Sequence, residues 1–363
     1  MSGTSQNPLR EADVLRALST VQEPELHKDL VTLNMVRNIR IDGGDVRFTV
    51  VLTTPACPLR ERIEREARAA VAALPGVNSV TIDFSADVSR RFSRAEEPLL
   101  PGVRNVIAVA SGKGGVGKST VAVNLAIALA QAGARVGLLD ADIHGPNVPL
   151  MMGIARQPVK GPNEKILPPV RYNVRVMSIA FFMTPDTPAI WRGPMVHSAI
   201  QQFLRDVEWG ELDYLVIDLP PGTGDAALTV AQLLPSARAV IVTTPQDVAL
   251  LDAGRSLAMF RRLNVPVLGI IENMSYFHCP HCGERTDIFG HGGGAAAAAA
   301  QGLKFLGAIA IDPAIRIGGD QGKPVTIAEP ESATAASFRE VAGQVAAAIS
   351  VANATEEAPV IIN

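Results

Sequence analysis

The residues with the clearest chemistry form the run GKGGVGKS, which begins at Gly112 and ends at Ser119. It matches the phosphate-binding pattern G-x-x-x-x-G-K-[ST], in which backbone N–H groups surround a phosphate, the lysine reaches the terminal phosphates and the hydroxyl can bind Mg²⁺. The fixed positions are filled by Gly112, Gly117, Lys118 and Ser119. The run also contains a second lysine, Lys113, which the pattern does not require.

The segments around this loop favour a nucleotide site. Residues 106–110 are an apolar run suited to a buried parallel strand, and residues 119–131 have helical periodicity, so a helix N-terminus would face the phosphate. Three loop glycines also fit the dinucleotide pattern G-x-G-x-x-G, and Asp140 ends the next strand, where a ribose-binding acid would lie. That alternative explains neither the lysine–serine pair after the last glycine nor a second acidic strand end at Asp218, so a nucleoside triphosphate is favoured.

Asp218 closes a mostly apolar run, residues 214–218, which read YLVID. An acid at the carboxyl end of such a strand holds Mg²⁺, usually through water, in proteins with this kind of loop. Residues 219–225 follow and read LPPGTGD. A stiff proline pair followed by glycines could pivot as a unit and present a backbone N–H to the terminal phosphate, with Gly222 as the candidate contact. An ordinary strand-to-helix loop is the alternative.

A different chemistry is indicated by Cys279 and Cys282, which form a C-x-x-C motif. A redox dithiol, a zinc site and an iron–sulfur site are all compatible with this spacing. Disulfide oxidoreductases carry the motif at a helix N-terminus early in a small βαβ domain, which does not fit its position after a strand that ends near Asn273. Zinc and iron–sulfur sites commonly need four ligands, so a symmetric dimer with the motif on its axis would complete the set.

The other residues of metal-binding type receive a simpler interpretation. His278 and His281 flank the cysteines so closely that they would crowd a single ion, and solvated side chains are favoured. Cys57 is interpreted as a buried, inert thiol, although its place at a strand-to-helix junction could lower its pKa.

Composition restricts the possible partners. The chain has 363 residues and a formal net charge of −3, with a pI near 6.1. It therefore lacks the electrostatic footprint of a protein that binds nucleic acid or an anionic membrane, and neither is expected as a partner. No secretory signal is visible, and no apolar stretch approaches the roughly 20 residues that a membrane span requires. We expect a cytoplasmic protein.

The order of predicted elements indicates two domains. Residues 1–86 predict a small α+β domain, and 87–103 have the charged, proline-containing composition of a linker. From 104 to 352 short apolar runs alternate with helical stretches, which indicates a mostly parallel sheet flanked by helices. A flexible tail is expected at 353–363. The predicted strands are 35–41, 45–52, 77–84, 106–110, 135–139, 214–217, 239–242, 267–271 and 305–311, and the other predicted helices are 10–20, 58–74 and the alanine run 295–300.

These motifs together resemble a known family. Residues 110–120, ASGKGGVGKST, resemble the deviant Walker A motif of the MinD/ParA class of P-loop ATPases, whose signature lysine matches Lys113. With the C-x-x-C and three further segments, the chain resembles the Mrp/ApbC iron–sulfur cluster carriers. Its first 86 residues resemble the small domain of SufT and PaaD proteins. The three further segments are 140–147 (DADIHGPN), 218–225 (DLPPGTGD) and 272–275 (ENMS).

The resemblance implies a role for each matching residue of a P-loop NTPase fold. Lys113 would reach across a dimer to the partner's nucleotide, and Asp142 would lie in switch I near Mg²⁺ and the attacking water. Lys118 and Asp218, the Walker B acid, complete the implied catalytic set, and Ser119, Asp142 and Asp218 the Mg²⁺ set. The residues implied to contact ATP are Gly112, Lys113, Gly114, Gly115, Val116, Gly117, Lys118, Ser119, Thr120, Gly222, Asn273, Asp312 and Pro313.

The resemblance also implies a function. Cys279 and Cys282 would hold a [4Fe–4S] cluster shared between the subunits of a homodimer, with slow ATP hydrolysis coupled to its loading or transfer. The partners would be apo iron–sulfur proteins and cluster assembly factors. One alternative is an ATPase with structural zinc at the C-x-x-C that acts in protein targeting. Another is a MinD/ParA-like spatial regulator, against which stand the acidic pI and the lack of a basic amphipathic helix after residue 353.

Overall fold

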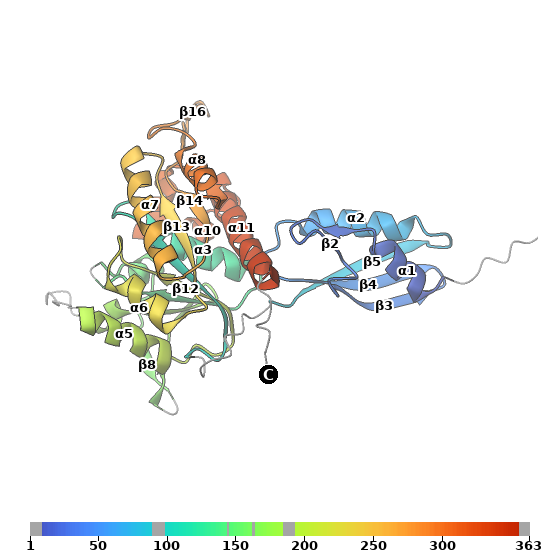
Figure 1. Cartoon of the computed structure of the whole chain (residues 1–363), viewed down its shortest axis with the longest axis horizontal. Coiled ribbons are helices and arrows are strands. Elements are labelled where there is room, and N and C mark those ends of the chain that lie inside the picture. The colour runs from blue at the N-terminus through green and yellow to red at the C-terminus, as the bar shows by residue number, and fades with distance from the viewer. Residues whose placement is uncertain (1–8, 89–98, 144, 162–163, 184–192, 356–363) are drawn as a thin grey trace, which may run out of the picture. The chain divides into compact units, whose positions relative to one another are not determined.

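Two hydrophobic cores divide this chain into separate units. The computed structural model describes residues 9–88, 99–143, 145–161, 164–183 and 193–355. One unit comprises Met1–Ser89 with Ala346–Asn363, and the other comprises Arg90–Val345 (Figure 1). Much of the linker predicted at 87–103 lies outside the described residues, and the domain bounds expected from the sequence stay a prediction.

The first unit contains a three-stranded sheet and two helices. Strands β3 and β4 pair antiparallel through a turn at Gly43 and Gly44, and β5 lies parallel to β4 on its other side. Alternate residues of β4 point into a core that side chains of both helices complete. The predicted small α+β region is therefore confirmed. Its elements are α1 (Glu11–Leu18), β1 (Gln22–Glu23), β2 (Lys28–Asp29), β3 (Val36–Asp42), β4 (Asp45–Leu52), α2 (Arg60–Ala72) and β5 (Ser79–Ala86).

The second unit is organised by an eight-stranded sheet in the order β10-β11-β7-β12-β6-β13-β14-β17. Every neighbouring pair is parallel except β10 and β11. The strands are β6 (Val103–Ser111), β7 (Val136–Asp140), β10 (Val170–Arg171), β11 (Val174–Ser178), β12 (Leu212–Asp218), β13 (Arg238–Thr243), β14 (Val267–Glu272) and β17 (Lys304–Ala308). The mostly parallel sheet predicted from the alternating pattern is confirmed.

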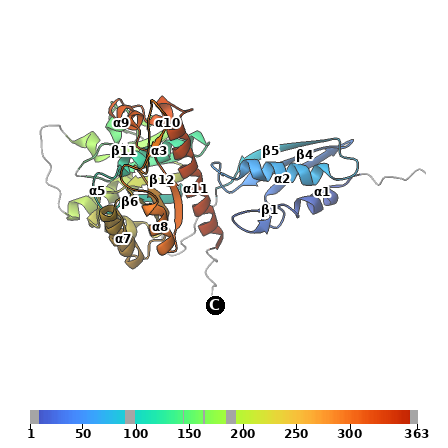
Figure 2. The same cartoon turned by 90° about the horizontal axis from the view of Figure 1, so that it is seen from above.

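Helices cover both faces of this sheet (Figures 1 and 2). All residues of β7, β12 and β13 are buried, which is why these strands read as continuous apolar runs. Two-residue strands β8 (Val159–Lys160), β9 (Ile166–Leu167), β15 (Phe277–His278) and β16 (Arg285–Thr286) form separate hairpins. The helices are α3 (Lys118–Gln131), α4 (Val148–Met151), α5 (Gly193–Asp206), α6 (Asp225–Leu233), α7 (Asp247–Arg262), α8 (Gly293–Ala300), α9 (Pro313–Asp320), α10 (Val325–Ala328) and α11 (Ala333–Thr355). The part of α11 from Ala346 onward is assigned to the first unit.

The differences from the sequence-based expectation lie at sheet edges and element ends. Strands β10 and β11 were not predicted, and the run 305–311 ends as a strand at Ala308. Helix α11 continues to Thr355, three residues into the predicted tail, and the remaining tail lies outside the described residues. Among the described residues no helix is long and apolar enough to cross a bilayer. The expected cytoplasmic location stays a prediction.

We expect Phe48→Ala to destabilise the first unit by about 3–5 kcal/mol, because Phe48 is fully buried and its removal leaves a cavity. Thermal denaturation of the full chain should show a transition at lower temperature, while nucleotide affinity, expected for the other unit, should stay unchanged. Phe84→Ala is the matched control, since the half-buried Phe84 should cost less. Equal losses in both variants would contradict this picture of the core.

Candidate functional site

The phosphate-binding loop joins the end of β6 to the first turn of α3. Gly115 and Gly117 have φ angles of +82° and +79°, a left-handed conformation that favours glycine. Gly112 is required for a different reason, because a Cβ there would lie 2.1 Å from the carbonyl carbon of Asp252 in α7. The glycines therefore serve both the turn and the close approach of a helix.

Lys118 lies at the centre of the site. Its side chain is buried, and its Nζ is 2.6 Å from Asp218 Oδ1 and 3.6 Å from Asp142 Oδ2. Nζ also lies 3.4 Å from the hydroxyl oxygen of Ser119. Four residues that the sequence placed in the catalytic and Mg²⁺ sets are thus brought together at the carboxyl ends of β6, β7 and β12.

Asp218 has the surroundings of a metal-side carboxylate. Its burial raises the pKa, and the charge and hydrogen bond of Lys118 oppose that rise. Oδ1 accepts the hydrogen bond from Lys118, whereas Oδ2 is buried and has no hydrogen-bond partner in the described part of the chain. An unpartnered buried carboxylate oxygen beside a hydroxyl is chemically suited to Mg²⁺ or to water bound to it.

Two further segments lie against the loop. The N–H of Gly222, which has a φ of +86°, donates to the carbonyl of Ser111 over 2.8 Å. The side-chain amide of Asn273 donates to the carbonyl of Val116 over 2.8 Å. The candidate phosphate sensor therefore contacts the end of β6 directly before the loop, and the candidate adenine contact touches the loop itself.

Lys113 and Thr120 occupy the two ends of the loop. Lys113 is half-buried, and its backbone carbonyl accepts a hydrogen bond from the Ser111 hydroxyl. Within the described residues its ammonium has no ion-pair partner, in contrast to Lys118. Thr120 lies half-buried in the first turn of α3.

Asp312 and Pro313 begin α9, with Asp312 as its N-cap. Asp312 Oδ1 accepts from the N–H of Ala314 over 2.8 Å, and Oδ2 accepts from the hydroxyl of Thr334. Both carboxylate oxygens therefore have structural partners. A place for this pair beside the adenine stays a prediction.

The two cysteines lie in the turn of the β15–β16 hairpin. The N–H of Cys279 donates a hydrogen bond to the carbonyl of Glu284 over 2.9 Å, and the N–H of Gly283 donates one to the carbonyl of Cys279 over 2.8 Å. The N–H groups of Cys282 and His281 point at the Cys279 sulfur and lower its pKa. The hairpin thus supplies a thiolate-stabilising turn with Cys279 half-buried and Cys282 exposed.

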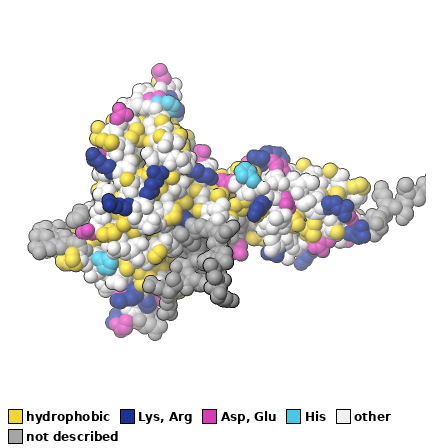
Figure 3. Space-filling model, viewed as in Figure 1, with side chains coloured by type: hydrophobic (Ala, Val, Ile, Leu, Met, Phe, Trp, Pro, Cys, Tyr) yellow, Lys and Arg dark blue, Asp and Glu magenta, His cyan; other side chains and the backbone are white. Residues whose placement is uncertain are grey.

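The histidines beside the C-x-x-C motif are exposed, as expected, whereas Cys57 is half-buried and not fully buried. His278 and His281 are exposed, and Figure 3 shows histidine and acidic side chains at the tip where Figure 1 labels β16. No set of three or more His, Cys, Asp or Glu residues that could hold a metal was found within the described ranges. In the other unit, burial raises the pKa of Cys57, the opposite of activation by a helix dipole.

Comparisons with known proteins agree with this geometry. Residues 102–346 match the ParA family of NUBPL iron-transfer P-loop NTPases, and residues 11–84 match the iron–sulfur cluster assembly protein family. The iron–sulfur cluster carrier protein of Synechocystis sp. is 51% identical over 344 residues, which cover 93% of this chain and 98% of that protein. This chain belongs to the iron–sulfur cluster carrier family.

Two solved structures resemble this chain over about two thirds of its length. A nucleotide-binding protein from Archaeoglobus fulgidus in complex with ADP is 41% identical, with a TM-score of 0.56 over 64% of this chain and 90% of that one. The cell division ATPase MinD from Pyrococcus furiosus is 25% identical, with a TM-score of 0.51 over 66% of this chain and 98% of that one. The P-loop NTPase fold expected for the carrier family is therefore confirmed.

The sequence indicated Asp140 only as the end of a strand. In the structure its carboxylate also holds the backbone that leads to Asp142. Its carboxylate accepts from the N–H groups of Asp142 and Val148, both over 3.2 Å, and from the Ser178 hydroxyl over 2.9 Å. The D-x-D spacing of Asp140 and Asp142 was the sequence signal that could have indicated a role for Asp140. Its partner Ser178 ends β11, a strand that the sequence analysis missed.

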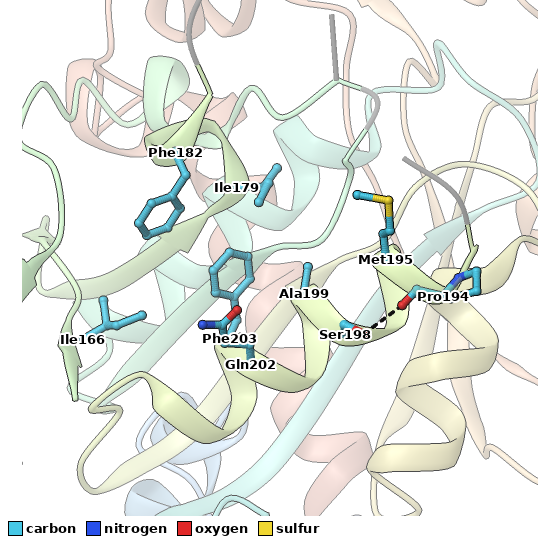
Figure 4. Close-up of a pocket in the computed structure, with 9 residues that line it drawn as sticks. All are labelled: Ile166, Ile179, Phe182, Pro194, Met195, Ser198, Ala199, Gln202 and Phe203. Carbon is cyan, nitrogen blue, oxygen red and sulfur yellow. Dashed lines mark hydrogen bonds between the residues drawn. The ribbon is translucent and has the colours of Figure 1, made fainter. Parts of the chain in front are cut away.

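A separate cavity of about 500 Å³ lies between α5 and the 3-10 turn Ile179–Phe182 (Figure 4). Its lining is mainly apolar, with Phe182 and Met195 at its exposed margin. None of the site residues expected for the carrier family lines it. The lining residues are Ile166, Ile179, Phe182, Pro194, Met195, Ser198, Ala199, Gln202 and Phe203.

We expect Asp140→Asn to flatten the pH dependence of stability in the nucleotide-free protein. Burial, and then the charge of Asp218, raise the pKa of Asp140 from 3.8 to about 8, so between these values the native state binds more protons than the unfolded state. Asp140 therefore lowers the free energy of unfolding as the pH rises through this window, by up to about 1.4 kcal/mol per pH unit.

Urea unfolding between about pH 5 and about pH 8 measures this slope. Asp320→Asn is the control, because Asp320 lies on the exposed surface of α9 and should keep the slope of the unmodified protein. Identical slopes in Asp140→Asn and the unmodified protein would show that Asp140 does not contribute.

Proposed function

We propose that this protein is an ATP-hydrolysing carrier that holds an iron–sulfur cluster between two copies of the chain and passes it to apo-proteins. The observation that carries the proposal is the turn at Cys279. It provides two thiols, one with a lowered pKa, in an exposed hairpin of the unit that contains the phosphate-binding loop. The names of the related carrier proteins support the cargo.

The nucleotide half of the proposal rests on Lys118. Its buried ammonium neutralises Asp218 and faces Asp142. A triphosphate in the loop would offer it a stronger and more numerous set of anionic oxygens, so Lys118 would move from the carboxylates to the phosphates. The two aspartates would then lose their cation and become available to other ligands.

Mg²⁺ fits the oxygens that this exchange leaves behind. Ser119, Asp218 and Asp142 would hold it directly or through water, and its charge would neutralise the phosphate oxygens. Asp142, fixed by the backbone contact to Asp140, is then the carboxylate that would orient an attacking water. Gly222, released from Ser111, would give its N–H to the terminal phosphate.

Lys113 supports the dimer independently of the cysteines. Its ammonium is unpaired within the described residues, while Lys118 already supplies the lysine that the loop requires. Across a symmetric interface it would contact the partner's nucleotide, as an arginine finger does. A dimer would also bring together four thiolates, enough for a [4Fe–4S] cluster.

A cluster held in this way would be suited to transfer. Cys282 is exposed, and the hairpin that carries both thiols consists of two-residue strands outside the main sheet. When the subunits separate, half of the cluster ligands leave, and thiolates of an apo iron–sulfur protein could replace them. Slow ATP hydrolysis would couple to this opening.

We predict that Lys118→Ala abolishes nucleotide binding, because it removes the phosphate ligand and leaves two buried carboxylates without their cation. Lys113→Ala should keep nucleotide binding but lower turnover by about 10³-fold or more, the scale of a charge clamp supplied in trans. Fluorescent-nucleotide titration and phosphate release measure the two effects. Lys160→Ala is the control, because Lys160 is exposed. Equal loss of nucleotide binding in Lys118→Ala and Lys113→Ala would contradict a role for Lys113 across the interface.

We predict that Cys279→Ala/Cys282→Ala abolishes cluster binding after anaerobic reconstitution with iron and sulfide. The unmodified protein should take up about two irons per chain, as expected for one [4Fe–4S] cluster per dimer, and Mössbauer spectra should identify the cluster. Cys57→Ala is the matched control. Undiminished iron uptake by the double variant would refute the proposal, and zinc uptake without iron or sulfide would favour a structural zinc site.

A further inference from the structure

The nucleotide loop and the cysteine turn are linked by one short segment. Asn273 follows β14 directly, and Cys279 lies six positions later in the chain. Asn273 is buried and donates its side-chain amide to the carbonyl of Val116 in the phosphate-binding loop. A single stretch of backbone therefore begins at the nucleotide site and ends at the first thiol.

The contact between Asn273 and the loop is close-fitting. A Cβ on Gly117 would lie 2.3 Å from the Asn273 amide nitrogen, so the segment approaches the loop as nearly as glycine allows. The next residue, Met274, has a φ of +56°, in the left-handed region that residues with a side chain rarely adopt. Such a conformation persists where its surroundings hold it in place.

The rest of the segment is fixed on both sides. The Ser275 hydroxyl donates to Glu272, and the Ser275 N–H donates to Ile309 O over 2.9 Å. Tyr276 O accepts from the N–H of Ile311 over 2.6 Å. These bonds leave the backbone between Asn273 and Cys279 few ways to absorb a displacement, so a movement at Asn273 would be felt at Cys279.

The aromatic ring of Tyr276 extends this connection into the hairpin. The guanidinium of Arg285 lies over the ring at 4.4 Å, and the ring of His278 meets it edge-on at 5.2 Å. Arg285 pairs with His278 across the hairpin, next to Cys279. Both strands that carry the cysteine turn are thus in contact with the segment.

The geometry of a peptide group explains how a phosphate would act on this connection. The carbonyl of Val116 and the N–H of Gly117 belong to one planar, trans peptide unit, so they point in opposite directions. A phosphate that attracts the Gly117 N–H would therefore reorient the same rigid unit whose oxygen is bonded to Asn273, and would polarise that bond.

We infer that Asn273 is a positioning residue that couples occupancy of the phosphate-binding loop to the conformation of the cysteine turn. The inference rests on the proposed function, in which the loop binds ATP and the turn binds the cluster. It adds the route between them, which is the Val116–Asn273 hydrogen bond and the segment from Asn273 to Cys279.

The test is hydrogen exchange of the β15–β16 hairpin in the full-length, cluster-free protein, with and without saturating non-hydrolysable ATP analogue. In the unmodified protein the nucleotide should change the exchange rate of the Cys279 and Gly283 amides by about threefold to tenfold, the range expected when one hydrogen bond is gained or lost. In Asn273→Asp, which keeps the shape but removes the amide donor, this response should disappear.

Two further variants complete the test. Ser275→Ala removes the contact with Glu272 without touching the loop, and it should weaken the response while nucleotide affinity stays normal. Asn38→Asp is the matched control, because Asn38 is exposed in the other unit and should leave the response intact. Nucleotide affinity is titrated for each variant so that all samples are saturated; if Asn273→Asp cannot be saturated, Ser275→Ala decides.

The outcomes separate this inference from the proposed function. The coupling route would be overturned if the nucleotide left the exchange rates of the unmodified hairpin unchanged, or if the variants at Asn273 and Ser275 responded normally. Neither result would affect the proposal that Cys279 and Cys282 bind iron. Loss of the response in these variants with normal cluster binding on reconstitution supports the coupling route. Failure of the unmodified protein to bind iron would refute the carrier function and leave the exchange result valid.

Discussion

The buried contact between Lys118 and Asp218 is the interaction on which the nucleotide site depends. Two carboxylates and an ammonium are buried side by side, and none of the three could be buried alone without a large desolvation cost. The ammonium of Lys118 therefore offsets the burial of both carboxylates. In the proposed function phosphates attract the same cation, so the carboxylates and the nucleotide would compete for one side chain.

The parallel sheet makes this arrangement possible. Because β6, β7 and β12 run in the same direction, their carboxyl ends meet at one edge, and the loop after β6 lies beside Asp140 and Asp218. The strand β14 ends at the same edge, which is why Asn273 reaches the loop from far along the chain. The cysteine hairpin follows directly and inherits its position from the sheet.

The sequence was sufficient to predict the elements that recur with a regular pattern. Apolar strands ending in acids identified the sheet, and the glycine and lysine spacing identified the loop. It could not predict that Lys118 pairs with the two aspartates, because this depends on how close three strand ends lie. Strand β11 was missed since its run, VRVMS, is short and carries an arginine, and the role of Asp140 was missed with it. The capping role of Asp312 could have been predicted from the sequence, because an aspartate directly before a proline commonly marks the start of a helix.

The bond between the N–H of Gly222 and the carbonyl of Ser111 has a consequence for the timing of nucleotide recognition. A single neutral hydrogen bond contributes on the order of 1 kcal/mol net, which corresponds to about a fivefold preference for the bonded arrangement. An attachment this weak opens often without any ligand. Release of Gly222 from Ser111 would therefore cost a terminal phosphate little, and most of the energy of its contact with the Gly222 N–H would be left to hold the nucleotide.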